Sequence, residues 1–551
     1  MNLIHDAWIP IRRKSGKVER ISPSQISEED IVSLAAPRPD FNGALIQFLI
    51  GLLQTTCAPE DKRGWRQWLR EPPSQEALQA AFEPVAHAFE LDGDGPRFMQ
   101  DGDLVDGTEC YIEQLIIEAP GEDRGLNTDH FIKRGSIHHI CVTCTAMAIL
   151  SMQINGPSGG RGYYPGLRGA GPLTTLVVGN SLWEAIWLNI IENNLFLNNY
   201  GNKEKIDQQE KFIWLGKLQH HHGNLKLFSD DLHPHSIFWP MPRRLKILFE
   251  KAEEQICDLC GVLADTIAKK YITKTIKYDG PWKHPLSPYR IQQNGNLNAI
   301  HPRSGGIGYR HWLWLIFSSQ STNATIEPAQ VVSSFLHNRP RNFRPELRLW
   351  SFGFDIKPGQ AKARCWYDST MPLLLIGDEF LEEYNYRIQS MIQTAEWACG
   401  AVILSFLRAT YFQPDLNKKN QIIWKAQKPW RKFEKCDEEN IESVTVRESK
   451  SILETIRVRF WQETEADFFH FLYRLRDALT ANVEALPILE DWRKRLIKEA
   501  EVIFDDLSQT GAFEAADPKR IALAWRDLQK SIRGKKVRKI LGLPEKQIAK
   551  S

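Results

Sequence analysis

The sequence lacks several features that would identify its class directly. Its 551 residues carry a formal net charge of only +2, so any basic surface for nucleic acid must be local. Long apolar runs are missing as well, because the best one, residues 44–53, is interrupted by Gln47 and is too short to span a bilayer. The first residues lack the basic and apolar segments of a signal peptide. We therefore expect a cytoplasmic protein.

Common catalytic motifs are also missing from the sequence. The chain contains no His-Glu-x-x-His, no Gly-x-Ser-x-Gly and no P-loop. Scattered Asp and Glu residues could be combined into a nuclease site on paper, but no spacing among them requires one. These absences disfavour a nucleotide-binding enzyme.

The composition is that of a soluble globular protein, with 42% hydrophobic and 25% charged residues. Up to about residue 375, strand-like pieces alternate with turns and helical segments, and the polar residues 195–235 look like an insertion. Beyond that point helical periodicity dominates and proline is scarce. The predicted fold class is α+β: a mixed α/β domain over 1–375, then a four-helix bundle over 376–551, with helices near 379–412, 447–484, 488–511 and 515–541.

Four of the nine cysteines form two Cys-x-x-Cys pairs, Cys141/Cys144 and Cys257/Cys260. Four thiolates suit tetrahedral zinc and leave no open coordination position, so a shared site would be structural. Residues 145–256 separate the pairs, which is far more than in a compact zinc ribbon. Spacing alone leaves two interpretations open: one shared zinc, or two unrelated pairs of thiols.

A glycine-rich loop follows the first cysteine pair at residues 156–171, and it contains Arg161 and Arg168. Its glycines do not have the spacing of a phosphate-binding motif. One interpretation is a plain flexible surface loop. In the other, the glycines let the backbone approach DNA, and the two arginines contact phosphate or the minor groove.

Two further segments are locally basic. Residues 269–283 place five lysines among three aromatic residues, a mixture that suits nucleic acid. A solvated hairpin edge protected by lysine is an equally good interpretation. Residues 530–551 carry eight basic residues and one acid, and either solvation or phosphate contact explains them.

Taken in order, these segments resemble the large subunit of the type I-E CRISPR surveillance complex, Cascade (the CasA family). The resemblance spans nearly the whole chain. No single motif is decisive, but the combined order and spacing of the motifs are specific to this family. They are residues 1–10, Phe98-Met99-Gln100, the first cysteine pair with Thr145-Ala146, the glycine loop with Gly166-Leu167-Arg168-Gly169, the second cysteine pair, Trp282-x-His284-Pro285-x-Ser287-Pro288 and the helical C-terminal region.

The resemblance implies a subunit that is not an enzyme. Such a subunit joins a guide-RNA (crRNA) ribonucleoprotein that contains backbone and small subunits. It recognises the protospacer-adjacent motif (PAM) on double-stranded DNA, helps to start R-loop formation and recruits a helicase–nuclease. A membrane is not among the partners that the resemblance implies. Base pairing with the guide reads the remaining sequence.

The resemblance also favours one structural Zn²⁺ held by all four cysteines of the two pairs. The alternative from another class is a zinc-dependent nucleic-acid-processing enzyme. That enzyme would need an open metal position, which four thiolates do not leave.

By position, the resemblance implies that the glycine loop contacts the PAM. The corresponding residues are Gly159, Gly160, Arg161 and Gly162, and Arg161 stands where relatives tend to have another glycine. The family's lysine finger aligns near Thr273 and Lys274, of which we choose Lys274.

Two more elements follow from the resemblance. Gln360 and Ala361 correspond to the wedge that pushes between base pairs, on a hairpin that looks longer here because of residues 357–359. Phe131, with Lys133 and Arg134, corresponds to the loop that contacts the guide's 5′ handle and the backbone subunits.

Overall fold

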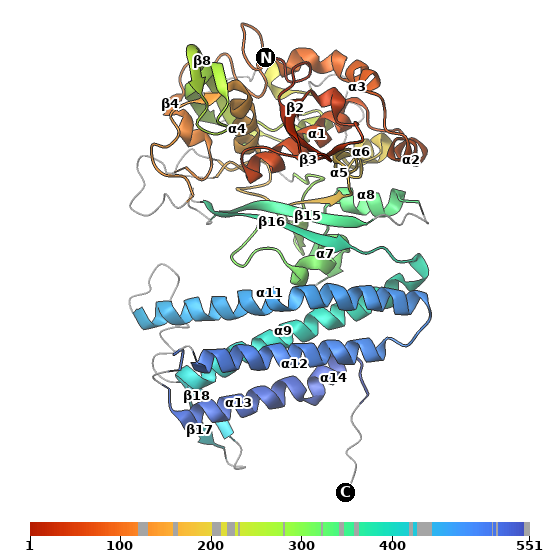
Figure 1. The fold of residues 1–551 in the computed structure, drawn as a ribbon, viewed down its shortest axis with the longest axis vertical. Coiled ribbons are helices and arrows are strands. Elements are labelled where there is room, and N and C mark those ends of the chain that lie inside the picture. The colour runs from red at the N-terminus through yellow and green to blue at the C-terminus, as the bar shows by residue number, and fades with distance from the viewer. Residues whose placement is uncertain are drawn as a thin grey trace. The chain divides into compact units, whose positions relative to one another are not determined.

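The structure is a computed structural model that describes most of the chain. Its described residues form two compact units (Figure 1). The first comprises Met1–Ile307 and Trp314–Leu373, and the second comprises Gly308–Leu313 and Leu374–Ser551. Helices and strands are both well represented, so the predicted mixed α+β class is confirmed. The described residues are 1–119, 131–157, 164–200, 211–216, 226–229, 232–278, 282–320, 323–340, 346–356, 363–417, 422–426, 444–509, 511–513 and 516–544.

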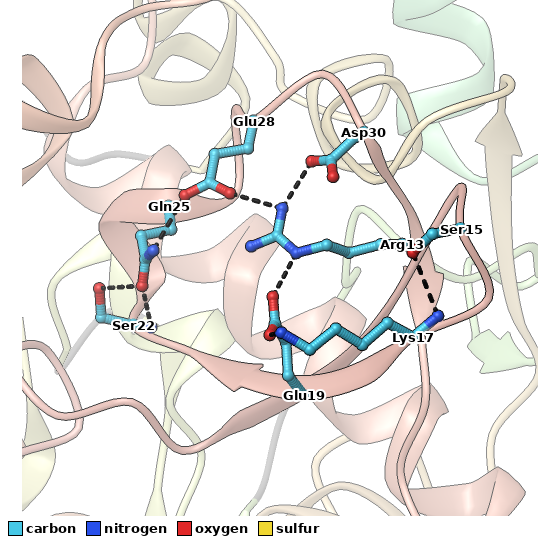
Figure 2. A network of polar contacts seen from close by, with 8 residues as sticks. All are labelled: Arg13, Ser15, Lys17, Glu19, Ser22, Gln25, Glu28 and Asp30. Carbon is cyan, nitrogen blue, oxygen red and sulfur yellow. Dashed lines mark hydrogen bonds and ion pairs between the residues drawn. The ribbon is translucent and has the colours of Figure 1, made fainter.

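The first unit begins with a small antiparallel sheet of order β2-β1-β3, formed by β1 (Ile9–Arg13), β2 (Val18–Ile21) and β3 (Ile31–Leu34). Arg13, the last residue of β1, contacts the carboxylates of three acidic residues (Figure 2). Its guanidinium donates to Glu28 at 2.7 Å and to Asp30 at 2.5 Å, and it also contacts Glu19. This partly exposed network fixes the turns of the sheet.

The core of the first unit is built around α1 (Pro39–Thr56). Proline at its first turn has the backbone angle of a helix start, and the apolar residues that follow leave most of the helix buried. The Phe48 ring lies at the centre, with edge-to-face neighbours at centroid distances of 5.3 to 5.9 Å. These neighbours are Trp8, Phe89, Phe98 and Trp239.

A long antiparallel hairpin, β8 (Arg243–Ile256) and β9 (Leu263–Thr275), carries much of the candidate site. Strand β9 pairs with β8 on one side, and on the other with β4 (Thr108–Tyr111) and β5 (Ile140–Cys141). The register of the hairpin shifts at Leu248/Phe249 and at Lys251/Gln255. Such irregularities bend a strand, here just before the turn that holds the second cysteine pair.

A second hairpin is formed by β15 (Leu347–Ile356) and β16 (Ala363–Leu373), and β15 also pairs with β6 (Thr174–Val178). The remaining strands of this unit form two further sheets, β7 (Lys226–Leu227) with β10 (Lys277–Tyr278), and a sheet of β11 (Tyr289–Gln292), β12 (Leu297–Ala299), β13 (Ser319–Gln320) and β14 (Ala324–Glu327). Its other helices are α2 (Lys62–Arg70), α3 (Gln75–Phe82), α4 (Val142–Asn155), α5 (Leu182–Trp187), α6 (Asn193–Tyr200) and α8 (Gln330–Asn338), and α7 (Trp312–Ile316) spans a point where the chain passes between the units.

The polar segment 195–235, predicted as an insertion, contributes to the core where it is described. Phe196, Phe212 and Trp214 are buried. The Phe212 ring packs against Phe89 and Trp239 at 5.2 and 5.5 Å. The described part of this segment is therefore not a purely exposed insertion, because these three aromatic residues anchor it to the core.

Helices dominate the second unit. They are α9 (Leu381–Tyr411), α11 (Val444–Thr480), α12 (Leu486–Gln509), α13 (Pro518–Arg533) and α14 (Lys535–Ile540), with a hairpin of β17 (Phe412–Leu416) and β18 (Ile422–Ala426). Helix α9 packs against α11, α12 and α13. The last helical stretch, expected to be continuous over 515–541, is interrupted at Gly534, whose backbone is extended.

The short segment Gly308–Leu313 belongs to the second unit although its sequence neighbours belong to the first. The Tyr309 ring stacks on Phe468 at 4.4 Å, and its hydroxyl shares a buried hydrogen bond of 2.8 Å with Thr464. This segment is thus part of the helical core.

Within the described residues, one helical segment, Asp378–Tyr411, is long and apolar enough to cross a membrane, although its apolar residues do not form one unbroken run and the sequence analysis did not single it out as a possible span. The apolar window of that segment is 67% buried against other parts of the protein. Such burial is typical of a core helix in a water-soluble protein.

Candidate metal centre and nucleic-acid interface

The two cysteine pairs, separated in sequence, lie together in the first unit and form what we call the cysteine cluster (Cys141, Cys144, Cys257 and Cys260). Cys141 is the N-cap residue of α4, and Cys144 lies in the first turn of that helix. Cys257 and Cys260 lie in the turn between β8 and β9. One pair is therefore held by a helix start and the other by a hairpin turn.

The geometry of the cysteine cluster fits a tetrahedral metal ion. Its four sulfur atoms lie within 4.8 Å of one another, and Cys141 Sγ is 3.7 Å from Cys260 Sγ. A tetrahedral zinc with Zn–S bonds of about 2.3 Å would place its sulfurs about 3.8 Å apart. All four cysteines are free of disulfide bonds. The sequence could not decide between one cluster and two separate pairs, and the structure gives one cluster.

Hydrogen bonds inside the cysteine cluster favour thiolates on the second pair. The Cys141 N–H lies 3.3 Å from Cys257 Sγ, and interaction with the Cys141 thiol lowers the pKa of Cys260 to about 6. The pKa of Cys257 is lowered as well, first by the same neighbour. The pKa of Cys144 is raised in turn, first by its contact with Cys141, and a bound metal would hold all four sulfurs as thiolates.

Two residues missed by the sequence analysis support the cysteine cluster. The Arg20 guanidinium, from β2, lies 3.8 Å from Cys260 Sγ, where its positive charge would stabilise a thiolate. The Asp258 carboxylate accepts hydrogen bonds from the backbone N–H groups of His138 and His139, at 2.7 and 2.9 Å. This carboxylate ties the cysteine turn to the strand that leads into α4. Neither residue has a spacing signal in the sequence.

The predicted PAM-contacting residues Gly159, Gly160, Arg161 and Gly162 lie outside the described residues. The structure does describe the two segments that flank them, Asn155–Pro157 and Tyr164–Gly171, which we call the loop neck. The Gly166 N–H lies 3.3 Å from the Gly156 carbonyl oxygen, and the Gly171 N–H lies 3.2 Å from that of Asn155. The neck is therefore held closed by its own backbone.

The suggestion that Arg168 contacts DNA is wrong. Its side chain is buried, and its guanidinium donates to Ser287 Oγ at 2.9 Å, to Thr174 Oγ1 at 3.1 Å and to Gln47 Oε1 at 2.5 Å. These partners are neutral, and burial lowers the pKa of Arg168 to about 10. The arginine fixes the loop neck to the core instead of facing a nucleic acid.

The far side of the loop neck is packed against two other elements. The His301 ring Nδ1 lies 3.0 Å from the Ala170 carbonyl oxygen. Gly171 has a positive φ of 62°, and a Cβ atom there would lie 2.6 Å from the Phe354 carbonyl oxygen of β15. Glycine is thus required both by conformation and by the closeness of the hairpin that carries the predicted wedge.

Lys274 lies near the end of β9, with its side chain about half exposed. Its ammonium group forms a 2.6 Å ion pair with Asp106. Two other lysines of this basic stretch are similarly paired, Lys269 with Glu250 at 2.6 Å and Lys270 with Glu109 at 2.7 Å. The local positive charge is therefore largely matched by carboxylates of the same unit.

The alternative that residues 269–283 form a lysine-protected hairpin edge is wrong for Lys270. Strand β9 pairs with β8 on one side and with β4 and β5 on the other, and Lys270 is paired with Leu248 of β8 and with Tyr111 of β4. Lys270 therefore does not guard an unpaired backbone.

The other predicted contact residues are only partly placed. Gln360 and Ala361 lie outside the described residues, but the base of their hairpin is described and ends with Ile356 opposite Ala363. Phe131 is 58% exposed, which is unusual for an aromatic side chain, and Lys133 and Arg134 beside it are exposed too. Their arrangement leaves an aromatic and two cations on one surface segment.

Comparison with solved structures shows that the chain has the fold of known CRISPR-associated proteins. The chain is similar to the CasA (Cse1) of Thermus thermophilus, with a TM-score of 0.66, 15% identity and coverage of 98% of this chain and 99% of that one. It is similar to Cse1 of Acidimicrobium ferrooxidans, with a TM-score of 0.68, 16% identity and 98% coverage of both chains. A chain of a CRISPR RNA-guided surveillance complex matches with a TM-score of 0.66, 15% identity and coverage of 97% and 99%.

The sequence itself identifies the family within this class. Residues 2–503 match the family model described as CRISPR-associated protein Cse1. The chain belongs to the Cse1 (CasA) family, and the resemblance to the Cascade large subunit is confirmed.

Proposed function

We propose that this chain is the large subunit of an RNA-guided surveillance complex and that it recognises the PAM on double-stranded DNA. The observation that carries the proposal is the family match over residues 2–503. Structural likeness to a chain of a CRISPR RNA-guided surveillance complex supports it over nearly the whole length. In this proposal a crRNA ribonucleoprotein with backbone and small subunits is the partner, and base pairing reads the target beyond the PAM.

DNA contact is assigned to three elements of the first unit. Gly159, Gly160, Arg161 and Gly162 approach the minor groove, Lys274 contacts the DNA from the end of β9, and Gln360 with Ala361 opens the duplex. The proposal is supported by a contact between two of these elements. The loop neck contacts the base of the β15–β16 hairpin at Phe354 and is anchored by residues of the core.

Contact with the guide's 5′ handle and the backbone subunits is assigned to Phe131, Lys133 and Arg134. An exposed aromatic ring can insert into a pocket or stack on a base, and neighbouring cations can contact phosphate. The exposure of Phe131 supports this role.

The cysteine cluster is assigned a structural Zn²⁺. Four sulfurs at tetrahedral spacing would fill the coordination shell of zinc, so the metal would stabilise the fold and leave no position for a substrate or for water. The proposed subunit is accordingly not catalytic. Destruction of the target is assigned to a helicase–nuclease that it recruits after R-loop formation, and the helices of residues 376–551 are assigned as a four-helix bundle in the same subunit.

The decisive experiment measures binding of the assembled complex to duplex DNA randomised at the motif. We expect a clear preference among motif variants, and equal affinity for all of them would refute the proposal. Steady cleavage of DNA by the isolated, metal-loaded chain would instead favour an enzyme.

A matched pair of variants tests the role of Lys274 in the same assay. Lys274→Gln should weaken duplex binding several-fold, because one phosphate contact is lost. Asp106→Asn should strengthen duplex binding by about twofold to threefold. In the wild type, Lys274 must leave its 2.6 Å ion pair with Asp106 before it can contact DNA, and this variant removes that ion pair. If both variants bind like the wild type, Lys274 is not a DNA contact.

A further inference from the structure

Arg243, the first residue of β8, joins the two ends of the predicted DNA-reading loop. Its side chain is 5% exposed. One nitrogen of its guanidinium, Nη2, donates to the Pro157 carbonyl oxygen at 2.6 Å, and the other, Nη1, donates to the Tyr164 carbonyl oxygen. Pro157 and Tyr164 are the residues immediately before and after residues 158–163. A single guanidinium therefore contacts the backbone at both ends of that segment.

Arg243 is itself held rigidly. The buried side-chain amide of Gln153, near the end of α4, binds the backbone of Arg243 in both directions. Its oxygen accepts from the Arg243 N–H at 3.0 Å, and its nitrogen donates to the Arg243 carbonyl oxygen at 2.8 Å. A Cβ at the neighbouring Gly156 would lie only 2.8 Å from the Met152 carbonyl oxygen, so the close turn at the end of α4 favours glycine there.

The strand register connects this arrangement to the second predicted DNA contact. Arg243 is opposite Thr275, and its neighbour Arg244 is opposite Lys274. Because adjacent residues of a strand point to opposite faces, Arg243 and Lys274 use different faces of the same end of the hairpin. The β8–β9 hairpin thus carries the loop neck on one face and the lysine on the other.

We propose that Arg243 is a positioning residue for motif recognition, in that it sets where the loop leaves the fold and re-enters it relative to Lys274. This inference rests on the proposed function, and it adds a residue that the sequence motifs do not include. Arg243 contacts only the protein in this role, so it should affect discrimination between motifs more than the general attraction to DNA.

Arginine is required here because of its shape. The planar guanidinium presents several N–H donors in a fixed fork, so it can reach two carbonyl groups at once, whereas a lysine ammonium is a single point on a flexible stem. Arg243→Lys keeps the charge and most of the volume but should lose one of the two carbonyl contacts. That makes it the conservative variant for a test.

The experiment compares the assembled complex carrying Arg243→Lys with wild type and with the control Arg66→Lys. Arg66 also donates to two backbone carbonyls of the first unit, those of Asn338 at 2.8 Å and Arg339 at 3.1 Å, but it is not part of the loop neck. The measured quantity is the ratio of affinities for the best and the poorest motif found in the randomised library. This ratio does not depend on the fraction of complex that is correctly assembled.

We expect Arg243→Lys to reduce the affinity ratio about tenfold, the size expected for one lost hydrogen bond to a charged group, while Arg66→Lys leaves it unchanged. A wild-type ratio kept by Arg243→Lys would overturn the inference. A wild-type complex without any motif preference would instead refute the proposed function, so the two failures are distinguishable.

Hydrogen exchange of the full chain gives a second measurement that needs no DNA. Arg243→Lys should accelerate exchange of the Gly166 amide, which is bonded to the Gly156 carbonyl oxygen across the neck. Unchanged exchange at Gly166 would show that Arg243 does not hold the neck, and this too would overturn the inference.

Discussion

The cysteine cluster and the loop neck join the same two elements by different chemistry. At the start of α4, Cys141 and Cys144 meet the turn of the β8–β9 hairpin. Near the end of α4, Gln153 and Pro157 meet Arg243 at the other end of β8. The first junction is built from four sulfurs that suit a metal, and the second from hydrogen bonds to backbone groups. One helix and one hairpin are thus fixed to each other at two points that different changes would disrupt.

The largest expected effect is at the cysteine cluster, for which a structural zinc is proposed. Cys257→Ser should remove one of four ligands and lower the free energy of unfolding by about 4 kcal/mol or more, because binding of a structural metal contributes directly to folding. Thermal unfolding of the full chain, with metal analysis of the purified protein, measures this. Cys110→Ser, at a partly exposed cysteine outside the cluster, should change neither quantity. Absence of metal in the wild type, with an unchanged midpoint for Cys257→Ser, would contradict the zinc assignment.

A smaller effect is expected at the loop neck from Arg168→Met. The change removes three donated hydrogen bonds and leaves Gln47, Thr174 and Ser287 without that donor, but it also relieves the cost of a buried charge. We expect a net loss of about 2 kcal/mol in the free energy of unfolding, without any change in metal content. A variant as stable as wild type would contradict the expectation that these hydrogen bonds contribute more than the buried charge costs.

The smallest effect concerns pH and His301. Burial lowers the pKa of His301, so the folded protein keeps this ring neutral while the unfolded chain binds a proton below about pH 6.5. Stability should therefore fall as the pH drops from 7 to 5.5, by at most about 1 kcal/mol from this residue. Urea unfolding at the two pH values, with excess metal to keep the cluster filled, should show a smaller pH dependence for His301→Gln. An equal pH dependence in both proteins would remove His301 as its source.

The two junctions also differ in how far the sequence could predict them. Paired cysteines at x-x spacing are rare and chemically specific, so Cys141/Cys144 and Cys257/Cys260 could be named in advance. Arg243 has no such signal, because arginine is common and its partners are backbone carbonyls, which every residue has. Its role depends entirely on the register that starts β8 beside the loop neck.

Arg168 shows why a motif does not fix the role of its residues. Its place in a glycine-rich loop suggested contact with DNA, yet the chain turns it inward to Gln47 and Ser287. Glycines around a cation indicate close backbone approach, but they do not say whether a nucleic acid or the protein's own core is approached. Lys270 of β9 is a second example, since its pairing with strands on both sides could not be predicted from the alternation of the sequence.

The family, the mixed α+β class, the two cysteine pairs and the mainly helical pattern beyond residue 376 could be predicted from the sequence alone. These properties are recorded in local spacing and periodicity, which act over a few residues. Three other features emerge only in the folded chain: the two cysteine pairs form one cluster, Arg168 is buried, and Arg243 joins the ends of the loop. Each of them depends on contacts between segments far apart in the chain, which are set by strand register and core packing.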